Sequence, residues 1–292
     1  ILKSDLSKLN KFNFFKGKKF KAFIHCAALT SVLDGANKIS TDFLYKNNLL
    51  STLNSLRLCN YLKSNFIYIS SSRVYSIQAI NKIKFKFNNN VSKLKKNNLT
   101  GLSSNGINEN FSTENPLSFY GSSKLICENL LKEYCKFYNI DYFINRCGLL
   151  SGSGQLYKND QGIISFWINS WKNKKKLNYI GFGGQGHQVR DCLHPLDLGT
   201  LIAKQINFFK NKSKKNMIYN VSGGIESAFS LKELSLWCKE NIFPKKIGYV
   251  KKGRPFDLKW IVLDNKKAKK AFNWDVEFSK NDIFCDINLN DN

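Results

Sequence analysis

Apolar runs and apolar helical stripes alternate along the first half of the chain. Residues 20–26 and 66–70 are mainly apolar runs, which is typical of buried parallel strands. Residues 41–63 repeat apolar side chains at helical spacing, and residues 120–138 do so again before another apolar run at 142–146. Strands that alternate with helices predict βαβ units and a parallel sheet, so the predicted fold class is α/β.

The second half shows a less regular alternation. The expected helices are 163–171, 195–206 and 231–241, and the last has Ser230 and Glu233 at the spacing of a capping box. The expected strands are 177–182, 187–193, 217–221 and 260–263, followed by a short final helix. Residues 77–112 are rich in Lys and Asn with little periodicity, which predicts a long functional or partly disordered loop.

A glycine-rich stretch from Gly181 to Gly186 matches the dinucleotide fingerprint G-x-G-x-x-G letter for letter. That fingerprint needs a helix that opens at its last glycine, so that backbone amides point at a pyrophosphate. Residues 187–193 alternate like a strand instead. We therefore predict a glycine-rich hairpin here and treat the match as coincidental.

The large positive net charge does not by itself identify a binding partner. The 292 residues carry a formal charge of +25, which can indicate nucleic acid or an anionic membrane. The lysines are spread along the whole chain without a basic helix, so a compositional bias explains them more simply. No apolar run reaches the ~20 residues of a membrane span, and no leader is recognisable. We expect no nucleic acid and no membrane as partner.

The eight cysteines contain no C-x-x-C pair, and several fall within predicted strands or helices. This pattern predicts buried free thiols in a reducing cytoplasm, with no zinc or other metal site and no disulfides.

The arginines are informative because Lys is used so freely: the chain has Arg57, Arg73, Arg146, Arg190 and Arg254. Arg is needed where a planar, bidentate donor meets phosphate or carboxylate, and Arg190 and Arg254 are the candidates for a diphosphate.

Tyr120 and Lys124 are a candidate catalytic pair. Residues at i and i+4 share one helix face, so both side chains can meet one ligand. A free tyrosine has a pKa of about 10, and a neighbouring positive charge lowers it. Such a pair can take a proton from a sugar hydroxyl while a hydride leaves the same carbon. The same spacing also occurs by chance on many helices.

The strand at 66–70 runs directly into Ser70, Ser71 and Ser72. The carboxyl ends of parallel strands are where open α/β sheets bind ligands. A strand, a serine and then Tyr-x-x-x-Lys resemble the extended short-chain dehydrogenases/reductases. That resemblance implies Ser71 as the third catalytic group.

Further motifs extend this resemblance from Asp5 to Trp274. They are His25-Cys-Ala-Ala, Asn48-Leu-Leu-Ser-Thr-Leu-Asn, Ser70-Ser-Ser-Arg-Val-Tyr, Tyr120-Gly-Ser-Ser-Lys, Arg190-Asp-Cys-Leu-His-Pro-Leu-Asp-Leu, Tyr219-Asn-Val-Ser-Gly-Gly and Arg254-Pro-Phe-Asp. In this order they resemble the NAD-dependent nucleotide-sugar epimerase/dehydratase family. Arg146-Cys-Gly, Asp160-Gln-Gly and residues 179–191 resemble its CDP-paratose 2-epimerase (CDP-tyvelose epimerase) branch.

The resemblance implies a Rossmann-like, doubly wound parallel sheet and a smaller α/β lobe. Residues 1–150, with contributions from about 187–222, would bind NAD, and residues 151–186 and 223–292 would bind substrate. Tyr120 would be base and then acid, Lys124 would bind the nicotinamide ribose and lower the tyrosine pKa, and Ser71 would hydrogen-bond the reacting oxygen. The implied cofactor contacts are Asp5, Leu6, Ala27, Ala28, Asn48, Tyr120, Lys124 and Cys147. The implied substrate contacts are Ser72, Arg73, Gln161, Gln188, Arg190, Arg254 and Asp257.

The implied reaction oxidises one sugar carbon to a ketone and reduces it again on the other face. The substrate would be a nucleotide-diphosphate sugar, with a CDP-sugar expected, and a homo-oligomer is left open. The alternatives are a 4,6-dehydratase or 4-epimerase of the same family, or a non-catalytic sugar-nucleotide-binding fragment. A dehydratase needs an acidic pair just after the catalytic hydroxyl, where Ser72 and Arg73 stand.

Two departures from the family pattern matter. Ser51 and Ser76 stand where glycines are usual. The family also opens with a strand, a glycine-rich loop and a helix that cradle the pyrophosphate, whereas this sequence starts at Ile1 and has no such glycine spacing before Phe20. The resemblance therefore implies a sheet that lacks its first βα unit or units, and poor NAD binding by residues 1–292.

Overall fold

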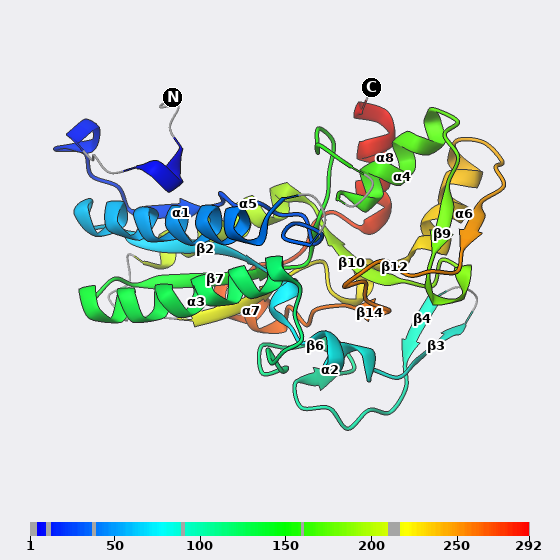
Figure 1. The fold of residues 1–292 in the computed structure, drawn as a ribbon, viewed down its shortest axis with the longest axis horizontal. Helices are drawn as coiled ribbons and strands as arrows, with labels where there is room; N and C mark the ends of the chain where they lie inside the picture. The colour runs from blue at the N-terminus through cyan, green and yellow to red at the C-terminus, as the bar shows by residue number, and fades with distance from the viewer. Residues whose placement is uncertain are drawn as a thin grey trace.

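A computed structural model of the chain describes residues 5–9, 13–36, 39–88, 91–158, 161–209 and 217–291. Its centre is a four-stranded sheet in the order β1-β2-β7-β11, in which all neighbouring strands are parallel (Figure 1). These strands are β1 (Ala22–His25), β2 (Asn65–Ser71), β7 (Tyr142–Cys147) and β11 (Met217–Val221). All four fall where the apolar runs predict strands, and the α/β fold is confirmed.

Helices cover both faces of this sheet. They are α1 (Thr41–Tyr61) and α3 (Phe119–Tyr138) on one face, and α5 (Pro195–Phe208) and α7 (Lys266–Phe272) on the other. Side chains alternate along a strand, so Phe66 of β2 packs with Leu56 and Leu131 of the first pair. The next residue, Ile67, packs with Leu201 on the opposite face. The sheet is therefore doubly wound, as predicted.

Serine side chains fix the starts of several helices. Ser40 accepts a hydrogen bond from Phe43 N at the start of α1, and Ser118 does the same for Gly121 N at the start of α3. Ser230 and Glu233 form the predicted capping box of α6 (Leu231–Asn241). These caps decide where each helix begins, and the cap at Ser118 puts Tyr120 in the first turn of α3.

A second sheet lies beside the first. It has the order β12-β10-β14, with β8 also paired to β10. The strands are β8 (Leu149–Leu150), β10 (Val189–Leu193), β12 (Ala228–Ser230) and β14 (Trp260–Ile261). A separate apolar cluster that contains Trp167, Leu234 and Ile287 joins it to α4 (Ile163–Lys172), α6 and α8 (Lys280–Asn290). Two helices, α7 and α8, follow β14 where one was expected.

The glycine-rich stretch is not a hairpin, which corrects that prediction. β9 (Asn178–Ile180) pairs in parallel with β13 (Gly248–Val250) and not with β10. A single 3-10 turn at Phe182–Gly184 follows, and residues 189–193 are extended, so no dinucleotide helix opens at Gly186 among the described residues. Gly186 has a positive φ, and a Cβ there would lie 2.5 Å from the ring of Tyr179. The glycine lets the backbone pack against that ring.

Residues 77–112 are more ordered than their sequence suggests. They contain α2 (Ile77–Asn81), the hairpin of β3 (Phe85–Asn88) and β4 (Val91–Leu94), and the short pair β5 (Leu102–Ser103) and β6 (Gly106–Ile107). Phe85 and Phe87 alternate with lysines and pack onto a cluster that includes Trp260 and Leu263. Period-two alternation, and not helical periodicity, was the signal in this segment.

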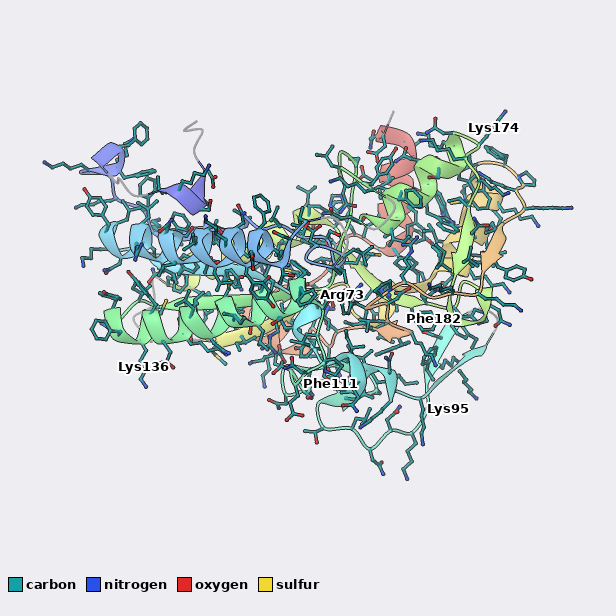
Figure 2. The ribbon with its side chains drawn as sticks, in the orientation of Figure 1. Arg73, Lys95, Phe111, Lys136, Lys174 and Phe182 are labelled. Carbon is teal, nitrogen blue, oxygen red and sulfur yellow. The ribbon has the colours of Figure 1, made fainter. Side chains whose placement is uncertain are left out.

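Charged side chains lie over many parts of the surface. Lys95 on the segment after β4, Lys136 on α3 and Lys174 after α4 point outward from three separate regions (Figure 2). The positive charge is therefore distributed over the molecule. In the part of the chain that the structure describes, no helix is both long and apolar enough to cross a membrane.

Candidate active site

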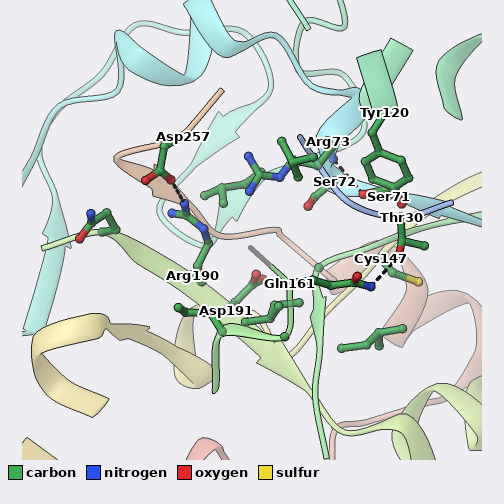
Figure 3. A pocket seen from close by; sticks show the side chains of 18 of the residues that line it. Thr30, Ser71, Ser72, Arg73, Tyr120, Cys147, Gln161, Arg190, Asp191 and Asp257 are labelled. Carbon is green, nitrogen blue, oxygen red and sulfur yellow. Dashed lines mark hydrogen bonds and ion pairs between the residues drawn. The ribbon is translucent and has the colours of Figure 1, made fainter. Parts of the chain in front are cut away.

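A cavity of about 500 Å³ lies at the carboxyl ends of β2 and β7, between the parallel sheet and the second sheet (Figure 3). This is the edge at which open parallel sheets bind ligands. Many of the predicted site residues line it together: Ser71, Ser72, Arg73, Tyr120, Lys124, Cys147, Gln161, Gln188, Arg190, Arg254 and Asp257. Residues from widely separated parts of the sequence thus meet in one place, and their individual roles stay predictions.

The first turn of α3 packs directly on the turn that follows β2. Gly121 makes this possible, because a Cβ there would lie 2.1 Å from the carbonyl oxygen of Arg73. On the other side of the same turn, Ser71 Oγ accepts a hydrogen bond of 3.2 Å from Arg73 N. The close packing brings the Tyr120 side chain to the hydroxyl of Ser71.

The pKa of Tyr120 is raised to about 12, because burial disfavours the phenolate. The hydrogen bond with Ser71 and the charge of Arg73 lower the pKa, but burial outweighs them. The sequence-based prediction that Lys124 lowers this pKa is therefore wrong. The Lys124 ammonium instead donates a 2.8 Å hydrogen bond to the carbonyl of Ile69 and lies over the ring of Tyr68.

A second group of predicted residues lies outside the cavity lining. These are Asp5, Leu6, Ala27, Ala28 and Asn48. Asp5 caps a short 3-10 helix by accepting from Ser7 N, and Asn48 is buried and bonded to both backbone groups of Leu29. Asn48 thereby fixes the loop after β1. The roles of these residues toward a cofactor stay predictions.

Arg190 is anchored by the protein itself. Its NH1 donates to the carbonyl oxygens of Val189 (2.8 Å) and Leu258 (2.9 Å), and its NH2 forms an ion pair of 2.8 Å with Asp257. A guanidinium that is held on three sides keeps a fixed direction. Arg190 is therefore a rigid part of the cavity wall.

Asp191 and Thr30 are among the lining residues that were not predicted. Asp191 is buried, Leu263 N donates to its Oδ2 at 2.9 Å, and burial raises its pKa to about 6. The signal that could have identified it is its place directly after Arg190, within the expected strand 187–193. Thr30 accepts a 2.6 Å hydrogen bond from Gln161 Nε2, which ties the loop after β1 to the loop before α4. Asp160, which belongs to one of the branch motifs, lies outside the described residues.

The cysteines are all free, as predicted. Burial holds for six of them, but Cys26 and Cys285 are exposed, so the prediction of buried thiols is wrong for these two. Cys26 and Cys147 both line the cavity. Among the described residues, no group of His, Cys, Asp and Glu side chains has the arrangement of a metal site.

A match to a known protein family shows to which family the chain belongs. The model of the NAD dependent epimerase/dehydratase family matches residues 2–222 of this chain. The chain belongs to this family. The family is NAD-dependent, so NAD is the cofactor.

Two curated relatives of the chain are named for different reactions. The dTDP-D-glucose 4,6-dehydratase of Dictyostelium discoideum is 30% identical over 215 residues, which is 73% of this chain and 44% of that protein. The CDP-paratose 2-epimerase of Salmonella typhi is 26% identical over 269 residues, 88% of this chain and 74% of that protein. The chain spans about half the length of the first curated relatives that it matches.

Solved structures share the fold at low identity. The UDP-glucose-4-epimerase of Stenotrophomonas maltophila, with bound NAD and formylated UDP-arabinopyranose, has a TM-score of 0.77 at 16% identity. The match covers 98% of this chain and 81% of that one. At this identity the comparison supports the Rossmann-like fold and no finer assignment.

The cavity residues fit a nicotinamide nucleotide. The Lys124 side chain is only 3% exposed, and its ammonium has three N–H groups, of which one is given to Ile69. Ribose hydroxyls are suitable acceptors for the others, and the Tyr120 hydroxyl lies on the same wall. The N–H groups of Lys124 that Ile69 does not use therefore suit the ribose of NAD, the cofactor of the family.

Proposed function

We propose that the chain carries the catalytic machinery of an NAD-dependent nucleotide-sugar epimerase of the CDP-paratose 2-epimerase type. One observation carries the proposal: Ser71 and Tyr120 share a cavity wall, and Arg190 and Arg254 line the same cavity. A sugar held by its diphosphate on the arginines would present a hydroxyl to the tyrosine. CDP is the nucleotide that the likeness to the CDP-paratose 2-epimerase of Salmonella typhi favours.

The chain's own groups would move one proton in each half of the reaction. In its phenolate form, which burial disfavours and which the Ser71 hydrogen bond and the charge of Arg73 favour, Tyr120 takes the proton of the sugar hydroxyl. Ser71 donates a hydrogen bond to the oxygen that becomes the ketone. After the sugar turns over, Tyr120 returns the proton to that oxygen. NAD supplies the reversible acceptor for the hydride of the same carbon, so the overall reaction is redox-neutral. Lys124 orients the ribose and keeps the two partners aligned.

The residues after Ser71 favour epimerisation over dehydration. A 4,6-dehydratase needs an acidic pair to remove water, and Ser72 and Arg73 occupy that place on the cavity wall. Among the described residues, the acidic side chains that line the cavity are Asp191 and Asp257, and both accept hydrogen bonds from other parts of the protein. The Arg73 guanidinium on the same wall suits an anionic substrate and supplies no carboxylate for the removal of water.

The test is to incubate the protein with CDP-paratose and saturating NAD, because the sequence predicts weak NAD binding, and to follow the sugar by nuclear magnetic resonance. We expect the 2-epimer to form without net formation of NADH. Elimination of water from a CDP-hexose, or a 4-epimer, would replace the proposal with one of the two other family reactions. Binding of CDP-paratose with no conversion would support a non-catalytic sugar-nucleotide-binding fragment.

A further inference from the structure

Arg73 joins the catalytic groups to the arginines on the other side of the cavity. Its backbone N donates to Ser71 Oγ, and its carbonyl oxygen meets Gly121, next to Tyr120. Its guanidinium NH1 donates a 3.1 Å hydrogen bond to the carbonyl oxygen of Phe256. In Figure 3, Arg73 lies between the Arg190 ion pair and Tyr120.

The guanidinium groups of Arg73 and Arg190 differ in the number of hydrogen bonds that they make within the protein. Arg190 makes three hydrogen bonds to Val189, Leu258 and Asp257. Within the described part of the chain, the Arg73 side chain makes one, to Phe256. A guanidinium carries five N–H groups, so Arg73 keeps most of its donors for a ligand. By this count Arg73 is better suited than Arg190 to bind an anion.

The charges around Arg73 also favour an anion. Arg73 and Arg190 are close enough to repel each other, and the nearby carboxylate is Asp257, which is paired with Arg190. Burial lowers the pKa of Arg73 to about 10, and the charge of Arg190 acts in the same direction. Among the described residues that line the cavity, the cations Arg73, Lys124, Arg190 and Arg254 outnumber the carboxylates Asp191 and Asp257, which leaves a net positive charge. A phosphate group placed between Arg73 and Arg190 would remove the repulsion.

We propose that Arg73 binds the phosphate nearest the sugar and thereby selects C2 as the carbon that reacts. This inference rests on the proposed epimerase function. C2 is bonded to C1, which carries the diphosphate, whereas C4 lies across the sugar ring. An arginine adjacent to both Ser71 and Tyr120 holds the phosphate close to the catalytic groups, so the near carbon meets the tyrosine. Phosphate bound only at a distant wall would favour C4.

The first experiment tests the anion site. CDP-glucose is titrated by calorimetry into the unmodified protein, Arg73→Gln and the control Arg57→Gln, which changes an exposed arginine on α1 outside the cavity. We expect Arg73→Gln to bind about tenfold more weakly or worse, which corresponds to about 1.4 kcal/mol, and Arg57→Gln to be unchanged. If Arg73→Gln does not fold, Arg73→Lys replaces it, with a loss of several-fold because a point charge lacks the guanidinium fork. Unchanged affinity in the folded Arg73 variant overturns the site.

The second experiment tests which carbon reacts. The unmodified protein is incubated with NAD and CDP-glucose, and the sugars are released by acid and separated. Mannose, the C2 epimer of glucose, supports the inference. Galactose, the C4 epimer, overturns the inference but keeps the epimerase function. Glucose alone, despite bound CDP-glucose, contradicts the proposed function itself, and the titration then decides separately on Arg73.

Discussion

The two walls of the cavity are built in different ways. The catalytic wall consists of Ser71, Tyr120 and Lys124, which lie on β2 and the first two turns of α3. The cationic wall consists of Arg190, Arg254 and Asp257, which come from β10 and the segment before β14. The catalytic wall is thus fixed by regular elements, whereas much of the cationic wall depends on contacts between distant segments.

The polar groups beneath the two walls show the same contrast. Under the catalytic wall, Glu128 accepts hydrogen bonds from Ser70 Oγ (2.7 Å) and Arg146 NH2 (2.7 Å), and its side chain is fully buried. In the cationic wall, Arg190 and Asp257 remain partly exposed. Changes under the catalytic wall should therefore act on folding, and changes in the cationic wall should act on binding.

The largest expected effect is on stability. Glu128→Gln leaves the buried guanidinium of Arg146 without a counter-charge, and breaking a buried pair in this way costs about 3–5 kcal/mol. The free energy of unfolding in urea measures the loss. The control is Glu133→Gln on the exposed face of α3, which should change the free energy by no more than about 0.5 kcal/mol. Equal stabilities of the two variants would remove the contrast between the walls.

The next effect is on substrate affinity. Arg190→Lys replaces a guanidinium that holds three protein acceptors with a point charge, so the wall loses its fixed geometry. We expect binding of CDP-glucose to weaken by about 1.5–3 kcal/mol, measured by calorimetry, with unfolding in urea much less affected. Arg57→Lys serves as the matched control. A normal affinity in Arg190→Lys would show that this wall does not bind the diphosphate.

The smallest effect concerns pH. His25 ends β1 under the catalytic wall, where the Ser55 hydroxyl lies 3.0 Å from its Nδ1, and burial lowers its pKa from 6.5 to about 3. The unfolded chain takes up the proton and the fold does not, so stability is fully present above the unfolded pKa and is lost as pH falls toward 3. The loss is at most about 1.4 kcal/mol per pH unit. Urea unfolding between neutral pH and pH 5.5 should show a shallower pH dependence in His25→Gln, and parallel curves would contradict this.

The regular elements were predictable because their signals are local. Apolar periodicity places β2, β7, α1 and α3, and the capping box places α6, since each depends on side chains close in sequence. The pairing of β9 with β13 joins residues that are far apart in the sequence. No local pattern predicts that the strand before the glycines pairs with β13 and not with the nearby β10. The ordered hairpin within residues 77–112 packs on the cluster of Trp260 and Leu263, which are also far from it in the sequence.

The candidate site was predictable as a set of residues but not as an electrostatic arrangement. The order of motifs identifies Ser71, Tyr120 and Lys124, but the burial of Tyr120 depends on the whole fold and raises its pKa instead of lowering it. The position of Arg73 between the two walls depends on the contact of its carbonyl with Gly121. Neither feature has a signature within a short stretch of sequence.

The most direct test of the account is the rate of epimer formation by Tyr120→Phe. This change removes one hydroxyl from a side chain that is 7% exposed, so the fold and the affinity for CDP-glucose should stay within a few-fold of those of the unmodified protein. Because the variant has no group to take the sugar proton, we expect the rate to fall by about a hundredfold or more. Nuclear magnetic resonance of the sugar under saturating NAD and substrate gives the rate. A rate within a few-fold of the unmodified protein would contradict the proposed role of Tyr120 and with it the central claim.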